Sequence, residues 1–152
     1  MNPVNDTELL LVEDNPQDLE LARRALRKVH LGDRIHVARD GEEACDFIFC
    51  EGAHRNRKSL RHLKLIILDL KLPKVAGVEV LRRIKGDPRT RTIPVVVLTS
   101  SQEPSDIMEC YGFGVNSFIV KPVDIDRFSE VVQELGLYWL RLNHSPKSEE
   151  LT

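Results

Sequence analysis

The sequence is poor in cysteine and aromatic residues, and it lacks a long apolar run. Cysteine occurs three times, at Cys45, Cys50 and Cys110, and aromatic residues make up 5% of the chain. The odd count and the absence of a CxxC pair disfavour a disulfide framework or a zinc site, so we interpret these cysteines as small buried hydrophobes. No apolar run approaches the roughly 18 residues that span a bilayer. Residues 1–7 show no basic-then-apolar leader, so we expect a cytoplasmic protein that does not bind membranes.

The chain also lacks an excess of either charge. Lys and Arg number 22 against 24 Asp and Glu, which gives a net charge of −2. This balance provides no overall attraction to nucleic acid or to an anionic lipid surface. With 41% hydrophobic and 30% charged residues in 152 positions, the composition is that of one folded domain and not of a disordered chain. We therefore expect a single domain over residues 1–152.

Four apolar runs predict the strands of a parallel sheet. None of them alternates polar with apolar residues, which is typical of strands that are covered on both faces. A weaker run at 34–38 does alternate and suits a strand nearer the sheet edge. The four runs are 9–12, 65–68, 95–98 and 118–120.

Helical patterns lie between these runs. They cover about 16–31, 40–48, 78–86, 105–112 and a last segment from Pro122 to about Leu142. Asn15 and Pro16 supply a helix cap followed by proline at the first helical position. A strand and a helix thus alternate five times, which predicts right-handed crossovers and a doubly wound α/β sheet.

Polar side chains end four of the predicted strands. Ligands of open α/β sheets bind beyond the carboxyl ends of the strands. The residues there are Glu13 and Asp14, Asp69, Thr99 and Lys121. Three clustered carboxylates repel one another unless a cation neutralises them, and Mg²⁺ prefers such oxygen ligands. An Asp carboxylate can act as the nucleophile toward phosphorus, while a lysine and a hydroxyl stabilise the phosphoryl oxygens. Each residue alone could be an ordinary cap, loop or surface residue, but their convergence favours a phosphoryl-transfer site.

These motifs resemble the receiver domain of two-component response regulators. The resemblance rests on Leu-Val-Glu-Asp-Asn at 11–15, Leu-Asp-Leu-Lys-Leu-Pro at 68–73, Leu-Thr-Ser-Ser at 98–101 and Val-Lys-Pro at 120–122. It covers about residues 7–135, which leaves a C-terminal helical extension at 136–143 and a tail at 144–152. It implies the CheY-like (flavodoxin-like) fold, a five-stranded parallel sheet in the order 2-1-3-4-5 with helices on both faces.

The resemblance also implies roles for the matching residues. Asp69 would be the phosphoacceptor, and Thr99 and Lys121 would contact the phosphoryl oxygens. Asp14 and Asp69 would bind Mg²⁺ directly, together with the backbone carbonyl of Lys71, and Glu13 would act through water. Phe118 matches an aromatic switch position, which we favour over an ordinary core aromatic. Such a protein is a phosphoacceptor in signalling and not an enzyme in the usual sense, although it can catalyse its own phosphotransfer and autodephosphorylation.

The C-terminal extension suggests a partner. On a continuing helix, Leu135, Trp139 and Leu142 share the apolar stripe of the preceding turns, whereas Tyr138 and Leu140 fall outside it. Such a segment is either an interface or a tail that folds back on its own domain. The chain resembles the small single-domain regulators of cyanobacterial and bacterial phytochromes. That implies a phytochrome-type sensor histidine kinase, and a homodimer through the fourth helix, fifth strand and fifth helix with Tyr138, Trp139 and Leu142.

Other interpretations are less well supported. The basic insert at 54–64 has no aromatic residue for base stacking, so we favour a solvated loop over a nucleic-acid site. A phosphohydrolase usually has a second acid two residues after the nucleophile, where this chain has Lys71. A receiver that signals by binding alone is disfavoured because the site residues are all present. A flavodoxin-like cofactor carrier would need a glycine-rich loop after the first strand, and that loop is absent from the sequence.

Overall fold

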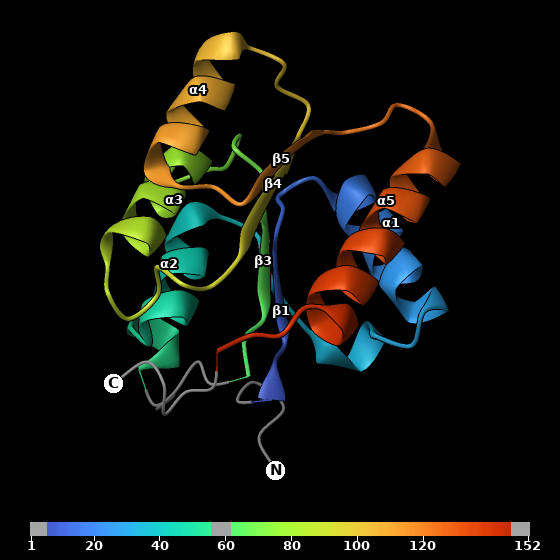
Figure 1. Ribbon diagram of the computed structural model, residues 1–152, viewed down its shortest axis with the longest axis horizontal. Coiled ribbons are helices and arrows are strands. Elements are labelled where there is room, and N and C mark those ends of the chain that lie inside the picture. Colours follow the sequence, from blue (N-terminus) through green and yellow to red (C-terminus); the bar gives the residue numbers. More distant parts are fainter. Residues whose placement is uncertain (1–5, 56–61, 147–152) are drawn as a thin grey trace.

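The computed structural model describes residues 6–55 and 62–146. Its centre is a parallel sheet of five strands in the order β2-β1-β3-β4-β5, as predicted (Figure 1). The strands are β1 (Leu9–Val12), β2 (Ile35–Ala38), β3 (Leu65–Leu68), β4 (Val95–Thr99) and β5 (Ser117–Val120). The weaker run forms β2 at the sheet edge, which confirms its predicted place.

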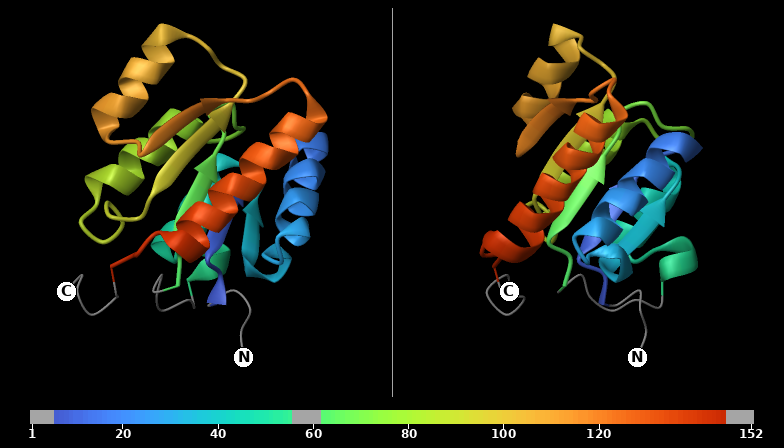
Figure 2. Two further views of the ribbon diagram at one scale, coloured as in Figure 1. Left: turned by 45° about the vertical axis from the view of Figure 1, so that its right-hand side comes forward. Right: turned by 90° about the vertical axis from the view of Figure 1, so that its right-hand side faces the viewer.

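Helices cover both faces of the sheet (Figure 1). On one face lie α1 (Pro16–Lys28) and α5 (Ile125–Leu137), and on the other lie α2 (Gly41–Phe49), α3 (Gly77–Gly86) and α4 (Pro104–Phe113). Figure 2 shows α1 and α5 side by side on their face. Two short 3₁₀ turns, at Gly32–Arg34 and Gly52–His54, lie outside these helices. The doubly wound architecture expected from the strand–helix alternation is therefore confirmed.

The alternating side chains of the central strands supply two separate cores. Leu10, Ile66 and Val97 pack beneath α2, α3 and α4, whereas Leu9, Ile67 and Val96 pack against α1 and α5. A fully buried Leu, Ile or Val side chain contributes roughly 1.5–3 kcal/mol, which favours this two-sided arrangement. That is why β1 and β3 are apolar at every position, and β4 is apolar up to the Thr99 that ends it.

β5 corrects one expectation. Its apolar run predicts a strand covered on both faces, yet Ser117, Phe118 and Ile119 are half-buried and Val120 is 36% exposed. The strand lies at the sheet edge, and within α4 only Cys110 is buried. The prediction that helices cover both faces of β5 was therefore wrong, although the strand itself is present.

The C-terminal extension corrects a second expectation. Residues Tyr138–Leu142 continue α5 as a π-helical turn, which is wider than the α-helical turn assumed from the sequence. The changed rotation turns Leu140 inward, where it is 2% exposed, and leaves Leu142 69% exposed. The predicted inward face was thus wrong for both leucines. Trp139 packs against the α1–α5 core, so the tail folds back in part, while Tyr138 stays exposed.

An ionic cluster holds this extension to the start of the sheet. The Glu8 side chain, which is 10% exposed, lies 2.9 Å from Lys64 Nζ and 3.3 Å from Arg141 Nη1. Lys64 Nζ also donates to the carbonyl oxygen of Leu140. These contacts fasten the last turn to the end of the sheet that lies opposite the carboxyl ends of the strands.

Two regions of interest lie partly outside the described residues. Residues 56–61 of the basic insert and 147–152 of the tail are among them, so the solvated-loop interpretation of the insert stays a prediction. Within the described part of the chain, no helix is long and apolar enough to cross a membrane.

Candidate functional site

The carboxyl ends of four strands meet at one edge of the sheet. Glu13 and Asp14 follow β1, Asp69 follows β3, Thr99 ends β4 and Lys121 follows β5. Parallel pairing brings these ends together, because Val12 pairs with Leu68 and Thr99 pairs with Val120. The structure therefore places all of these predicted side chains at a common edge.

Asp69 is the centre of the site. Its side chain is buried, and Oδ1 accepts a hydrogen bond of 2.7 Å from the Thr99 hydroxyl and one of 3.2 Å from the Lys71 amide. Its other oxygen, Oδ2, accepts a bond of 2.8 Å from Lys121 Nζ. Burial would raise the pKa of Asp69, but the contacts from Lys121, Thr99 and the Lys71 amide outweigh burial and lower it. Asp69 is therefore held as a carboxylate, which is the form that can act as a nucleophile.

Lys121 bridges three carboxylates. Its ammonium donates to Glu13 Oε1 at 2.7 Å and to Oδ2 of both Asp18 and Asp69 at 2.8 Å. Burial alone would lower the pKa of Lys121, but the hydrogen bonds to these carboxylates raise it. The side chain is 11% exposed. A permanent positive charge therefore lies within hydrogen-bonding distance of Asp69.

The pKa of Glu13 shifts in the opposite direction from that of Asp69. Burial, together with the negative charge of Asp69, raises its pKa to about 7 despite the hydrogen bond from Lys121. Its second oxygen, Oε2, accepts from the Asn15 amide at 3.1 Å. Both Glu13 oxygens are thus engaged by the protein, and the role of Glu13 through water stays a prediction.

Three of the acids could hold a divalent cation. Carboxylate oxygens of Glu13, Asp14 and Asp69 lie within 4.8 Å of one another, and Asp14 is exposed to solvent. Two carboxylates with several waters match the preference of Mg²⁺. The close spacing and the all-oxygen donor set fit such an ion. The Lys71 amide lies beside Asp69, but ligation by the Lys71 carbonyl stays a prediction.

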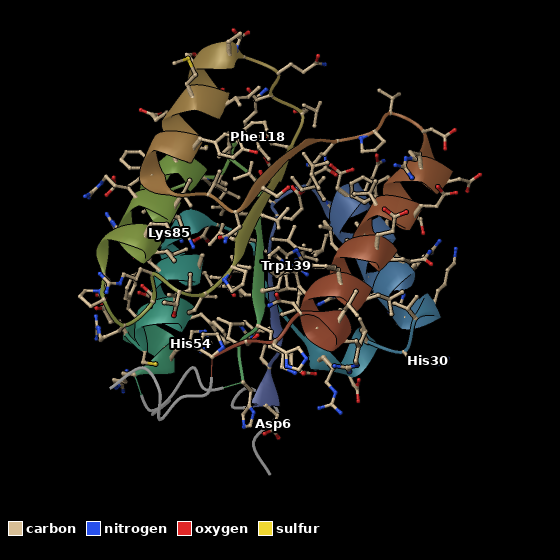
Figure 3. All side chains as sticks on the ribbon, viewed as in Figure 1. Asp6, His30, His54, Lys85, Phe118 and Trp139 are labelled. Carbon is tan, nitrogen blue, oxygen red and sulfur yellow. The ribbon has the colours of Figure 1, made fainter. Side chains whose placement is uncertain are left out.

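Phe118 lies next to the site but outside its polar cluster. It pairs with Val97 across β4 and β5 and packs against the core under α2, α3 and α4 (Figure 3). The ring is half-buried, between α4 and the sheet. It is therefore less enclosed than a typical core aromatic, and its predicted switch role stays open.

The sequence reasoning missed Asp18. It belongs to the first turn of α1, where an acid has an obvious explanation in the helix dipole. Asn15 caps this helix by accepting from the amides of Gln17 and Asp18, at 2.9 and 3.0 Å, which orients the first turn toward the strand ends. The available signal was position, because the first turn of a helix that follows a strand lies at the same sheet edge.

The backbone at the start of α3 lies directly against the backbone of Asp69 and Leu70. A Cβ atom built on Gly77, the first residue of α3, would lie 2.2 Å from the Asp69 carbonyl oxygen and 2.6 Å from Leu70 Cα. Only glycine lets α3 begin this close to the strand end. The start of α3 therefore fixes the backbone that carries Asp69.

The sequence matches a family model over most of its length. Residues 9–133 match the response regulator receiver domain. Among curated proteins, the probable methanogenesis regulatory protein FilR2 of Methanothrix harundinacea is 41% identical, over 91% of this chain and 86% of its own length. Response regulator Rcp1 of Synechocystis sp. is 36% identical, over 87% of this chain and 88% of its own length.

Solved structures give the same picture. The phosphorylated cyanobacterial phytochrome response regulator RcpA superposes with a TM-score of 0.85 at 36% identity, over 93% of this chain and 99% of its own. The Mn²⁺-bound form of Rcp1 superposes with a TM-score of 0.84 at 34% identity, over 92% of this chain and 99% of its own. Both similarities extend over nearly the whole of this chain.

Proposed function

The chain belongs to the response regulator receiver domain family, and from this premise we propose that Asp69 accepts a phosphoryl group from a sensor histidine kinase. The observation that carries the proposal is the contact of Asp69 with both Thr99 and Lys121, at 2.7 and 2.8 Å. A buried carboxylate that is held ionised by an ammonium, and touched by a hydroxyl from a different strand, is arranged for phosphoryl transfer.

The proposed reaction is an in-line transfer. One Asp69 oxygen forms a bond to phosphorus while the bond from phosphorus to the kinase histidine breaks, and the departing imidazole nitrogen keeps the electron pair. Thr99 and Lys121 then donate to phosphoryl oxygens instead of to Asp69. Mg²⁺, held by Asp14, Asp69 and the Lys71 carbonyl, with Glu13 through water, would supply further positive charge to those oxygens.

The switch that we propose starts at Thr99. A phosphoryl group adds roughly −1.5 to −2 of charge, toward which the Thr99 hydroxyl is drawn. This movement frees space beside β4 for the half-buried Phe118 ring, and α4, β5 and α5 repack around it. A tenfold population shift needs only about 1.4 kcal/mol, which one charge-assisted hydrogen bond can provide.

For the partner we propose a phytochrome-type kinase. The support is the likeness to RcpA, whose name links it to a cyanobacterial phytochrome. The name of FilR2, a probable methanogenesis regulatory protein, supports the alternative that the partner belongs to another signalling system. The Asp69 chemistry is the same for either partner.

We also propose that the protein forms a homodimer. The face of α4, β5 and α5 exposes large apolar side chains, including Met108 at 75%, Tyr111 at 53% and Ile125 at 62%. Tyr138 and Leu142 of the extension are exposed as well, whereas Trp139 lies mostly against its own core. Within the described residues, the exposed large apolar side chains all belong to the segment from α4 onward, and such a concentration is typical of an interface.

Phosphotransfer tests the proposed function. A histidine kinase of the phytochrome class, loaded with a radiolabelled phosphoryl group, is mixed with the protein and Mg²⁺. We expect the label to pass to the parent chain and not to Asp69→Asn. Transfer to Asp69→Asn at the parent rate would show that another residue is the acceptor.

A further inference from the structure

Asp18 contacts the site through Lys121. Its Oδ2 lies 2.8 Å from Lys121 Nζ, and its side chain is 29% exposed. The acids grouped by spacing as possible metal ligands are Glu13, Asp14 and Asp69, without Asp18. Within the described residues, the contact that ties Asp18 to this site is therefore its bond to the lysine.

The Lys121 ammonium has three N–H groups, and all three point at carboxylates. Glu13 and Asp69, two of its three partners, belong to the acidic cluster that could bind a cation. A cation shared by those acids would weaken their hold on the ammonium. Asp18, outside the cluster, is the partner that would remain.

The Asp18 carboxylate is well placed for this task. The Asn15 cap fixes the Asp18 backbone, and α1 packs along α5 on the face of the sheet. Lys121 comes from the other direction, at the end of the edge strand β5. The contact thus joins the capped start of α1 to the loop that follows β5, the least covered strand.

We infer that Asp18 is a positioning residue for phosphoryl transfer, which keeps the Lys121 ammonium beside Asp69 when a divalent cation occupies the acidic cluster. The inference rests on the proposed function of Asp69. It assigns to Asp18 no contact with the phosphoryl group or with the metal. Its effect on the reaction passes entirely through the lysine.

The test compares Asp18→Ala and Asp18→Asn with the parent. Each protein is phosphorylated with acetyl phosphate at saturating Mg²⁺ and donor, and Mg²⁺ affinity is measured separately by calorimetry. We expect the saturated rate to fall roughly tenfold in Asp18→Ala, as expected for a misplaced catalytic group, with little change in Mg²⁺ affinity. Asp18→Asn, which keeps an acceptor oxygen, should recover part of the rate. Asp33→Ala, at an exposed position before β2, is the matched control and should behave as the parent.

Repeating the substitution in a Lys121→Met protein distinguishes an effect on the position of Lys121 from a general loss of structure. In Lys121→Met the substitution Asp18→Ala should cause no further loss of rate, because its target is gone. The ¹⁵N signal of the Lys121 ammonium should be visible in the Mg²⁺-loaded parent and lost in Asp18→Ala. An Asp18→Ala protein with the parent rate, or an equal loss in the Lys121→Met background, would overturn the inference. The parent rate itself tests the proposed function, so a failure of that function can be told apart from a failure of the inference about Asp18.

Discussion

Among single residues, Thr99 makes the most direct test of the site, because its hydroxyl donates a buried hydrogen bond to Asp69. The Thr99 side chain is inaccessible to solvent, and its hydroxyl donates to Asp69 at 2.7 Å. Removing the hydroxyl leaves the carboxylate with Lys121 and the Lys71 amide. We therefore expect Thr99→Ala to accept phosphate from acetyl phosphate roughly tenfold more slowly, which corresponds to a hydrogen bond of about 1.4 kcal/mol. Thr99→Ser, which keeps the hydroxyl, should stay within about threefold of the parent, and equal loss in both variants would contradict the role of the hydroxyl.

Lys85 supplies a prediction on pH. Its ammonium donates to the carbonyl oxygens of Arg91 and Ile93 and to Asn116 Oδ1, at 3.1, 2.8 and 2.9 Å (Figure 3). Burial lowers the pKa of Lys85 to about 8. Between that value and the ordinary lysine value of about 10.4, the unfolded chain binds more protons than the folded one, so the free energy of unfolding rises with pH.

The measurement compares the parent with Lys85→Met. From pH 8 to 10 the parent should gain stability relative to the variant by on the order of 1 kcal/mol, because the side chain is partly exposed and its carbonyl partners favour the ammonium. Urea unfolding at several pH values follows this difference. Parallel curves for the two proteins would show that Lys85 titrates normally.

Among the helices and strands, the start of α3 fixes the backbone position of Asp69, because Gly77 lies directly against the Asp69 carbonyl oxygen. Because a Cβ on Gly77 would overlap the Asp69 carbonyl oxygen, we expect Gly77→Ala to cost about 2 kcal/mol or more and to slow phosphorylation. Gly86→Ala, at the other end of the same helix, meets no atom within 4 Å. That control should be neutral or stabilise by about 0.5–1 kcal/mol, and a similar loss in both variants would mean that helix propensity, not the contact, is responsible.

The π-helical turn that continues α5 predicts which of two leucines contributes to stability. Leu140 is buried and Leu142 is exposed, contrary to the pattern of a regular helix. Leu140→Ala should therefore cost about 2–5 kcal/mol in thermal or chemical unfolding. Leu142→Ala should stay within about 0.5 kcal/mol of the parent. The reverse order would restore the α-helical register that the sequence predicted.

These elements show where sequence reasoning succeeded. β1 and β3 were predicted at their observed bounds because burial on both faces leaves a continuous apolar run. The site residues follow directly from the strand ends. By contrast, the coverage of β5 depends on how tightly α4 packs, and the facing of Leu140 depends on one widened turn. Asp18 was missed because an acid in the first turn of a helix already has an explanation in the helix dipole, and its contact with Lys121, 103 residues away, is marked only by the position of that turn at the sheet edge.

The proposed dimer concerns the whole molecule. Met108 on α4 and Leu142 on the extension are both largely exposed, so Met108→Glu and Leu142→Glu should each bury a charge in the interface and weaken association. Sedimentation velocity measures the monomer fraction of each variant. Ala53→Glu, exposed beside α2, is the control and should leave association unchanged. A dimer that survives both substitutions would place the interface elsewhere.

The proposed function of the whole molecule depends on one reaction at Asp69. The parent protein and Asp69→Asn are incubated with Mg²⁺ and acetyl phosphate, and the intact masses are measured. We expect the parent to gain the mass of one phosphoryl group, to lose it on hydroxylamine treatment, and to remain unmodified when Mg²⁺ is chelated, while Asp69→Asn gains nothing. A parent chain that never gains this mass, or an Asp69→Asn chain that gains it equally, would contradict the account.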